Sequence, residues 1–301
     1  MGPTATGKTD AAAQLYDAFD AEIISVDSSL VYRHMDIGTA KPDADFLKKY
    51  PHHLVNIRHP NEVYSVAEFY TDCTKLIESI TAQGKIPVLA GGTMFYFNAL
   101  ENGLSELPQA NPQLRAQIAD EATAIGWPSL HQRLAELDPA SAQRIDSMDA
   151  QRIQRALEIV LESGKPVLEH NSERKPGLEN PIIKLGLSFS DRQFLHARIE
   201  QRFDLMLEQG LQAEVETLLE MGVEADASSM RMIGYRQMLE FLSEITSHQE
   251  MRSKGIAATR QLAKRQLTWL RNQRNLIWWV DSGLKDKDFS QLVDLIDQFI
   301  G

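Results

Sequence analysis

The sequence predicts an α/β fold in which helices flank a parallel sheet and an all-helical domain is inserted into the core. Three observations support this prediction. Short β-rich runs alternate with amphipathic helical patterns, which is typical of parallel sheets. Polar residues and glycines follow the ends of these runs, where parallel sheets bind ligands. A phosphate-binding motif also opens the chain, directly before a helix-forming segment.

The phosphate-binding motif is the segment GPTATGKT, residues 2–9, which fits the pattern G-x-x-x-x-G-K-[ST] at every fixed position. Gly2 and Gly7 allow the backbone to turn successive N–H groups toward one anion, and Lys8 adds a positive charge. The Thr9 hydroxyl is suited to Mg²⁺, and the helix that follows attracts anions to its N-terminus. The alternative is a chance glycine-rich turn, but the complete match favours a P-loop NTPase-like core that binds phosphate and Mg²⁺.

The core elements follow the loop in a regular order. Residues 21–26 form a β-rich run that ends at Asp27, and residues 66–82 have helical periodicity. A second β-rich run, residues 85–90, ends at Gly91, Gly92 and Thr93. Because the carboxyl ends of parallel strands meet at one edge, we expect Asp27 and Thr93 to lie near the loop.

The middle of the chain has helical periodicity and little strand character. Proline-rich and polar segments bracket it, and we predict a helical insertion domain over residues 108–181. Strands are predicted again at 182–189 and 277–280. The predicted organisation is therefore a first core part at 1–107, the insertion, and a second core part at 182–301.

One strand of the expected core is missing from the sequence. A phosphate loop of this type joins a buried strand to a helix, yet only Met1 precedes Gly2. We expect this strand to lie upstream of Met1 in a longer natural chain, or the sequence to be truncated.

Composition limits the class of protein. The 301 residues are 43% hydrophobic and 24% charged, which is typical of a soluble globular protein. Cys73 is the single cysteine, so a disulfide framework is excluded and a reducing, cytoplasmic setting is expected. No apolar run has the length of a membrane span. We expect a monomer without a membrane partner.

The net charge of -11 argues against a nucleic-acid partner, but the charge is unevenly distributed. Residues 251–280 contain seven basic residues and no acid. On a helix, Arg260, Lys264 and Arg271 share one stripe beside an apolar stripe of Ala263, Leu267 and Leu270. A solvated basic face is the alternative. The length of the acid-free stretch favours contact with a nucleic-acid backbone.

Six blocks, in order along the chain, resemble the signature of the bacterial tRNA dimethylallyltransferases, also called tRNA isopentenyltransferases. They are SVDSSLVY at 25–32, MDIGTAKP at 35–42, GGTMFY at 91–96, QRIQRALE at 151–158, RMIGYRQM at 231–238 and TRQLAKRQLTWLR at 259–271. The resemblance implies transfer of the dimethylallyl group of dimethylallyl diphosphate to the exocyclic N6 amine of the adenosine 3′ of the anticodon, with release of diphosphate. The loop and Asp27 alone would also fit a small-molecule or nucleotide kinase, and a non-catalytic RNA-binding protein is a second alternative.

The resemblance also implies roles for individual residues. From its position alone, Asp27 could contact Mg²⁺, act as a general base or cap a loop; the resemblance favours the base, with Thr93 placing the adenine or the base. Thr9 is the expected metal contact. The expected diphosphate contacts are Gly2, Thr4, Ala5, Thr6, Gly7, Lys8, Thr9 and Arg202, although Arg202 could also be a surface residue of a helix.

The expected partner is the anticodon stem-loop of tRNA, with the helical insertion as a clamp on the stem. The target base must leave its stack to reach the catalytic groups. The expected tRNA contacts are Asp27, Ser28, Ser29, Leu30, Gln151, Arg152, Ile153, Gln154, Arg155, Arg231, Met232, Ile233, Gly234, Tyr235, Arg236, Lys264, Arg265, Gln266, Leu267, Thr268, Trp269, Leu270 and Arg271.

Overall fold

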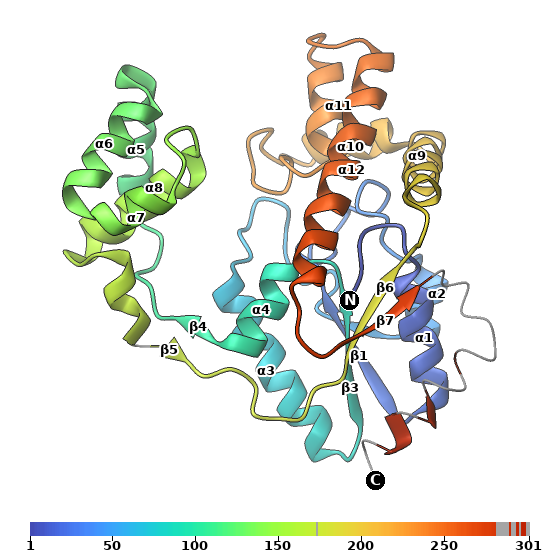
Figure 1. Ribbon diagram of the computed structural model, residues 1–301. Helices are drawn as coiled ribbons and strands as arrows, with labels where there is room; N and C mark the ends of the chain where they lie inside the picture. The colour runs from blue at the N-terminus through green and yellow to red at the C-terminus, as the bar shows by residue number, and fades with distance from the viewer. Residues whose placement is uncertain (173, 281–288, 290–292, 295, 299–301) are drawn as a thin grey trace. The chain divides into compact units, whose positions relative to one another are not determined.

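A computed structural model describes residues 1–172, 174–280, 289, 293–294 and 296–298 (Figure 1). The chain forms two compact units. Unit 1 comprises residues 1–99 and 179–301, and unit 2 comprises Leu100–Leu178. The helical unit therefore begins before the predicted boundary at 108 and ends before the predicted boundary at 181.

The shifted boundaries have a structural cause at the place where the chain enters and leaves unit 2. Strand β4 (Leu104–Ser105) pairs antiparallel with β5 (Arg174–Lys175). The Leu178 N–H also donates to the Leu100 carbonyl at 2.8 Å. The segments that enter and leave the unit are thus hydrogen-bonded to each other, a non-local pairing that short polar runs do not reveal.

Unit 1 contains the predicted parallel sheet. Strand β1 (Ala21–Val26) lies between β2 (His52–His53) and β3 (Ile86–Gly91), and all three are parallel. Two further strands, β6 (Lys184–Ser188) and β7 (Leu276–Val280), form a second parallel pair. Val26 is in register with Gly91, so β1 and β3 end side by side. The register places Asp27 and Thr93 at one edge, as the sequence predicts.

Helices cover both sides of this sheet. Helix α1 (Lys8–Ala18) follows the phosphate loop, and α3 (Val66–Ala82) begins with a capping box of Ser65 and Glu68. Both helices contact β3, and Figure 1 shows them on opposite sides of β1 and β3. Ile23 and Ile24 are fully buried, because a parallel strand covered on both faces has no solvent side.

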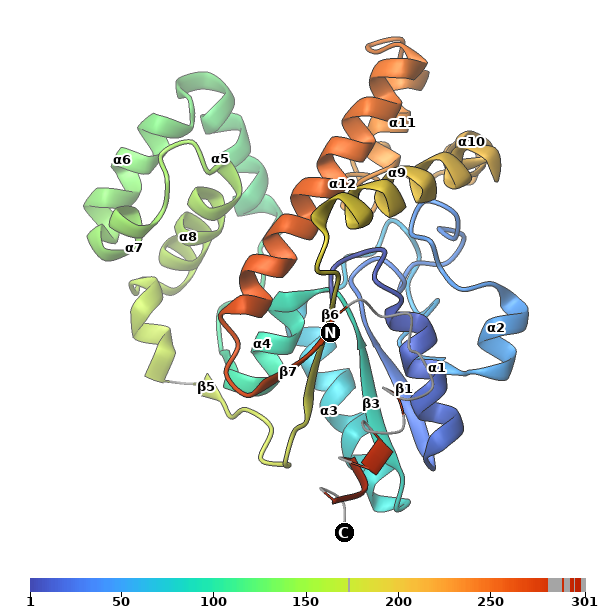
Figure 2. The same ribbon diagram turned by 45° about the vertical axis from the view of Figure 1, so that its right-hand side comes forward.

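The beginning of the phosphate loop is held against β6. The Met1 backbone nitrogen donates to the Leu185 carbonyl, and the Leu187 N–H donates to the Met1 carbonyl, both at 2.8 Å. Figures 1 and 2 place the N-terminal label beside β6. Met1 therefore pairs with β6 as a strand residue would, while the expectation of an upstream strand stays a prediction.

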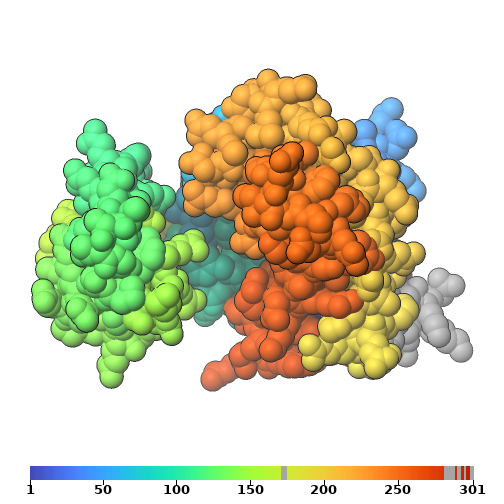
Figure 3. All heavy atoms as spheres, turned by 90° about the horizontal axis from the view of Figure 1, so that it is seen from above, coloured from blue at the N-terminus to red at the C-terminus, as the bar shows by residue number. Residues whose placement is uncertain are grey.

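A helical layer follows β6 in unit 1. Its members are α9 (Arg192–Glu208), α10 (Leu211–Glu220), α11 (Tyr235–Leu242) and α12 (His248–Arg271). Helices α9 and α12 cross in contact, and α12 also packs on α11 (Figure 2). In the space-filling view, this layer forms the face of unit 1 that is turned to the viewer (Figure 3). Helices α2 (Ala44–Lys49) and α4 (Met94–Asn102) are two further helices of the chain.

Unit 2 is helical around its own core. Its helices are α5 (Pro112–Ile125), α6 (Trp127–Leu137), α7 (Pro139–Arg144), α8 (Ala150–Ser163) and the 3₁₀ helix η1 (Val167–Ser172). The core includes Ile118, Leu130, Leu134 and Leu157, all almost fully buried. Three helices with proline in the first turn and a separate apolar cluster are consistent with a unit that packs by itself.

Candidate active site

The phosphate loop has a bent backbone with internal polar contacts. Gly7 has a φ of 82° directly before α1, and Ala5 has a φ of 64°, a conformation that non-glycine residues rarely adopt. The Thr6 hydroxyl donates to the Pro3 carbonyl at 2.8 Å, and the Lys8 ammonium donates to the same carbonyl at 2.6 Å. The loop therefore curls around its own Lys8 at the N-terminus of a helix, which is the geometry of an anion site.

Charges from distant parts of the chain meet at this loop. Burial, and after it the nearby Arg202 guanidinium, lowers the pKa of Lys8 to about 8, and Asp27 opposes both effects. Burial also lowers the pKa of Arg202 from its ordinary value, and Asp27 again opposes this effect. Two cations kept partly out of water beside one loop favour an anion of high charge. The structure thus brings together Lys8, Arg202 and Asp27 from α1, α9 and the end of β1.

Arg198 is a contact of the loop that sequence reasoning missed. Its Nε donates to the Ala5 carbonyl at 2.9 Å, and its guanidinium lies over the rings of Phe189 and Phe194. It precedes Arg202 by one helical turn on α9, so both side chains share one face. The i, i+4 spacing of two arginines was the signal in the sequence. The contact supports the backbone of Ala5 at its unusual φ.

Asp27 and Thr93 lie side by side at the ends of β1 and β3. The Ser28 N–H donates to the Thr93 hydroxyl oxygen at 3.0 Å, and the Thr93 N–H donates to the Val26 carbonyl at 3.2 Å. One carboxylate oxygen of Asp27, Oδ1, accepts from the Ser29 N–H and hydroxyl at 2.9 and 2.5 Å. These contacts orient the carboxylate and leave its Oδ2 atom outside the Ser29 contact.

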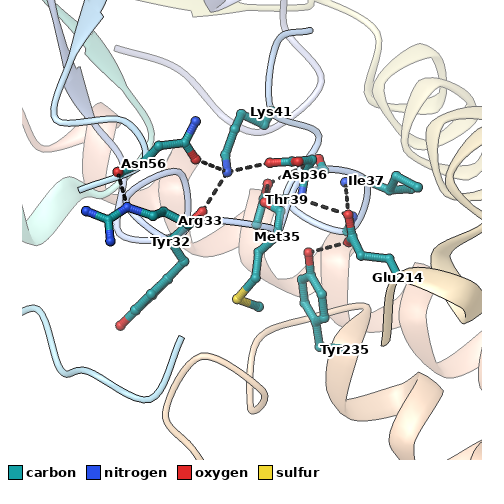
Figure 4. Close-up of polar contacts among 11 residues, drawn as sticks. Tyr32, Arg33, Met35, Asp36, Ile37, Thr39, Lys41, Asn56, Glu214 and Tyr235 are labelled. Carbon is teal, nitrogen blue, oxygen red and sulfur yellow. Dashed lines mark hydrogen bonds and ion pairs between the residues drawn. The ribbon is translucent and has the colours of Figure 1, made fainter. Parts of the chain in front are cut away.

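The segment after Asp27 is held by a carboxylate of α10 (Figure 4). Glu214 accepts from three consecutive N–H groups, those of Asp36, Ile37 and Gly38, at 2.8, 2.7 and 3.0 Å. It also accepts from the Tyr235 hydroxyl at 2.7 Å. Burial and the Glu214 carboxylate raise the pKa of Tyr235, so this hydroxyl stays protonated as a donor.

Lys41 also holds this segment in place, through three hydrogen bonds of its ammonium group (Figure 4). Its ammonium donates to the Tyr32 carbonyl, the Asp36 carboxylate and the Asn56 side chain at 2.6, 2.6 and 2.7 Å. Burial lowers the pKa of Lys41, and the hydrogen bond to Asp36 opposes this effect. The MDIGTAKP block therefore folds a loop that is bonded to Tyr32, Asn56 and Glu214. Ser28, Ser29 and Leu30, which precede this loop, are all partly exposed.

Four of the residues expected to contact tRNA have internal roles instead. Ile153 is fully buried in the core of unit 2, and Tyr235 is fully buried against Glu214. Gln266 is 7% exposed, and its amide contacts Thr4 and Gly92. Leu270 is also fully buried. We correct these four assignments, because a helix must bury one face and a motif on that helix includes buried positions.

Thr4 of the phosphate loop also has an internal partner. The Thr4 N–H donates to the Gln266 side-chain oxygen at 3.0 Å, so this N–H points to α12, while the diphosphate contact of Thr4 stays a prediction. Sequence reasoning could not find this bond, because the two residues lie 262 positions apart.

The basic stretch of α12 is partly neutralised by acids of α9. Arg252 pairs with Asp204 at 2.6 Å and with Glu200 at 2.9 Å, and Arg260 pairs with Glu200 at 3.0 Å. The guanidinium of Arg260, one residue of the predicted basic stripe, thus joins α12 to α9.

The later part of α12 keeps its positive charge at the surface. Lys264, Arg265 and Arg271 are exposed, and no acid pairs with them in the part of the chain that the structure describes. Leu267 and Trp269 are half-buried, and Thr268 is exposed. These residues leave a basic surface on the side of α12 opposite to its buried Ala263 and Leu270.

The remaining predicted tRNA contacts divide between the units. In unit 1, Arg231 and Arg236 are exposed, and Met232 and Ile233 are half-buried, before and at the start of α11. Gly234 is buried, so its expected contact with tRNA is corrected as well; its φ of 95° lets the backbone turn into this helix.

In unit 2, Gln151 and Arg152 are exposed on α8, and Gln154 is half-buried. Arg155 donates to the buried Glu158 carboxylate at 3.2 Å and to the Pro108 carbonyl at 2.8 Å. The guanidinium of Arg155 thus joins α8 to the segment at Pro108 within unit 2.

The described residues offer no ready-made metal cage. Among residues 1–172, 174–280 and the described positions beyond, no group of three or more His, Cys, Asp or Glu could hold a metal ion. Mg²⁺ is usually held by one or two protein oxygens together with phosphate oxygens and water. The half-buried Thr9 hydroxyl at the loop fits that mode. Over the same described residues, no helix is long and apolar enough to cross a membrane.

Comparison with known sequences gives a consistent family. Residues 30–273 match the model of the family described as IPP transferase. The tRNA dimethylallyltransferase of Aromatoleum aromaticum is 54% identical over 278 residues, which cover 91% of this chain and 87% of that protein. The protein of the same name from Methylobacillus flagellatus is 51% identical over 274 residues, with 90% and 87% covered.

Comparison with solved structures agrees. The full-length tRNA isopentenylpyrophosphate transferase of Bacillus halodurans has a TM-score of 0.71 and 35% identity, covering 99% of this chain and 94% of that one. A eukaryotic dimethylallyltransferase acting on tRNA has a TM-score of 0.80 and 28% identity, covering 99% of this chain and 78% of that one.

Proposed function

The chain belongs to the IPP transferase family, and from this membership we propose that it is a tRNA dimethylallyltransferase with dimethylallyl diphosphate as donor. The observation that carries the proposal is the meeting of Lys8, Arg202 and Asp27 at the phosphate loop. Two cations would hold the diphosphate, and a carboxylate lies beside them at the end of β1.

The reaction requires one bond to break and one to form. The exocyclic N6 nitrogen of the target adenosine attacks the first carbon of the dimethylallyl group, and the carbon–oxygen bond to diphosphate breaks. Diphosphate leaves with the electron pair of that bond, and the proton of the amine moves to the Asp27 carboxylate. Because the amine lone pair is delocalised into the ring, removal of its proton during attack lowers the barrier.

Stabilisation of the leaving group is the main task of the loop. Negative charge grows on the diphosphate as the bond breaks, and fixed donors aimed at that charge stabilise the transition state more than the ground state. The half-buried Lys8 and Arg202 and the loop amides at the start of α1 supply such donors. Arg198 supports them through the Ala5 carbonyl.

We propose that Mg²⁺ assists at the same place, held by the Thr9 hydroxyl and by diphosphate oxygens. When bound, it would neutralise part of the charge of the leaving group.

The tRNA would be held by phosphate contacts on exposed basic side chains. Lys264, Arg265 and Arg271 of α12 and Arg231 and Arg236 near α11 are exposed in unit 1. Such contacts position an RNA without reading its sequence. Ser28 and Thr93, at the strand ends, would then line the place of the extruded adenosine, for which we propose the position 3′ of the anticodon.

The test is transfer to an unmodified tRNA. The protein is incubated with the tRNA and dimethylallyl diphosphate, and the digested nucleosides are examined by mass spectrometry. We expect one adenosine to gain a dimethylallyl group, and diphosphate to be released in equal amount. A parallel incubation with ATP tests the kinase alternative, and transfer of its γ-phosphate without dimethylallyl transfer would refute the proposal.

A further inference from the structure

Gln266 lies at the junction of three segments that are far apart in the sequence. It is on α12 and is 7% exposed. Its side-chain oxygen accepts from the Thr4 N–H at 3.0 Å, and its side-chain nitrogen donates to the Gly92 carbonyl at 2.7 Å. One amide thus joins the basic helix to the phosphate loop and to the turn after β3.

The turn is shaped to admit this amide. A Cβ atom at Gly92 would lie 2.7 Å from the Gln266 side-chain nitrogen, closer than packed atoms approach. It would also lie 3.4 Å from the Gly2 carbonyl and 3.7 Å from the Lys8 side chain. Gly92 therefore lets Gln266 reach a place where the loop, its lysine and the Thr93 turn meet.

Both ends of the Gln266 amide are used, which fixes its orientation. The oxygen can only accept and the nitrogen can only donate. A reversed amide would therefore place its own N–H group against the N–H of Thr4. Buried hydrogen bonds of this kind are costly to leave unmade. A movement of α12 would therefore be transmitted to Thr4 and Gly92, because the buried amide has little solvent nearby to replace either bond.

The opposite face of α12 carries the basic surface. Gln266 is on the buried face with Ala263 and Leu270, whereas Lys264, Arg265 and Arg271 are exposed. A helix is rigid over this length. The position of the basic side chains is thus tied directly to the position of the phosphate loop by the amide of Gln266.

We propose that Gln266 is a positioning residue that couples RNA binding on α12 to diphosphate binding in the loop; the role rests on the function proposed above. RNA bound to the basic surface fixes the position of α12. Gln266 then holds Thr4 and the turn after β3 in the geometry that binds the diphosphate. Coupling between two sites is reciprocal, so each ligand strengthens binding of the other by the same factor.

The experiment measures this factor directly. The dissociation constant of inorganic diphosphate is determined with and without a saturating anticodon stem-loop RNA, and that of the RNA with and without diphosphate. We expect each ligand to strengthen the other by about 5-fold or more in the wild-type protein. In Gln266→Leu the factor should fall close to one, while RNA affinity in the absence of diphosphate changes little.

Gln261→Leu is the matched control. Gln261 is an exposed glutamine on the same helix, so the substitution has the same chemistry but touches neither the loop nor the turn. The control should keep the wild-type factor. A purely structural role of Gln266 would lower thermal stability and both affinities together, without changing the factor by which one ligand affects the other.

Gln266→Glu serves if the leucine variant does not fold. It keeps side-chain length and an acceptor for the Thr4 N–H, but it has no N–H for the Gly92 carbonyl, so the coupling factor should also fall. A wild-type protein without coupling, or variants that keep it, would overturn the role of Gln266. Failure of dimethylallyl transfer would instead refute the proposed function, because the binding factor is measured with inorganic diphosphate and needs no transfer.

Discussion

At the scale of single residues, the site depends on how Asp27 is oriented. The Ser29 N–H and hydroxyl occupy Oδ1, and the Thr93 hydroxyl holds the neighbouring Ser28 backbone. In the role of base proposed above, a carboxylate held in this way would need no reorganisation before it accepts a proton, which is the advantage of a preorganised site. Asp27 lies near enough to Lys8 and Arg202 to act on both electrostatically, and Arg202 acts on Lys8.

Asp27→Asn should slow the chemical step by about 10²- to 10⁴-fold, because the amide keeps the Ser29 contacts but cannot accept the proton. Tight RNA binding should remain. The measurement is single-turnover transfer over a Mg²⁺ series. Asp20→Asn, an exposed position just before the other end of β1, is the control and should keep wild-type rates. Recovery of the rate of the Asp27→Asn variant by excess Mg²⁺ would assign a metal role to Asp27.

Lys8 should take up a proton when diphosphate binds at about pH 9. Its pKa of about 8 in the free protein means that the amine is mostly neutral there, and the bound anion favours the charged form. At about pH 6.5 the amine is already protonated, and no uptake at Lys8 is expected. Calorimetry in buffers of different ionisation enthalpy measures the uptake.

Lys8→Met isolates the contribution of Lys8 from the protons of diphosphate itself. The difference between wild type and variant should approach one proton at the higher pH and vanish at the lower pH. Equal proton uptake by the two proteins at both pH values would show that Lys8 does not meet the anion.

At the scale of elements, α12 serves two purposes on two parts of its surface. Its first half is joined to α9 through Arg252 and Arg260 with Glu200 and Asp204. Its second half exposes basic residues and carries Gln266 on the buried face. Ion pairs between partly exposed groups contribute little energy each, but here they share acids in one network, which fixes the crossing of the two helices.

The double substitution Lys264→Ala with Arg271→Ala should weaken tRNA binding and lower its salt dependence. The slope of log K against log salt should fall by about one for each phosphate that the variant no longer binds. Lys254→Ala is the control, because Lys254 lies on the same helix but pairs with Glu240 at 3.0 Å. An unchanged slope in a folded double variant would remove this part of α12 from the RNA interface.

At the scale of the whole molecule, the two units have separate cores. Unit 2 packs around Ile118, Leu130, Leu134 and Leu157, and its two ends are joined by the β4–β5 pair. The expected diphosphate contacts all lie in unit 1. Damage to the core of unit 2 should therefore leave the phosphate site intact.

Leu134→Ala tests this separation. Leu134 is fully buried on α6, and its truncation should cost about 2–5 kcal/mol of the stability of unit 2. Hydrogen exchange should become faster in peptides from residues 100–178, with no change in β1 or β3 and with normal binding of inorganic diphosphate. Leu137→Ala is the control, because Leu137 is on the same helix and is 40% exposed. Faster exchange in β1 or β3 would show that the units unfold together.

The local elements and the loop before α1 were determined by the sequence itself. Helix α3 begins at the predicted residue because Ser65 and Glu68 form a cap within four residues. The loop, α1 and the strand ends at Asp27 and Thr93 follow from periodicity and from the alternation of parallel strands. These features depend on bonds between near neighbours or on a repeating pattern, both of which are written in a short stretch of sequence.

The direction of individual side chains was decided only by tertiary structure. The sequence showed an acid-free stretch at residues 251–280, but Arg252 and Arg260 of this stretch meet acids 48 and 60 positions earlier in the chain. Gln266 stands within a basic motif yet points inward, to partners 262 and 174 positions away. Such contacts exist only after helices and strands have packed, because packing selects which face of each helix is buried. No local pattern carries that choice.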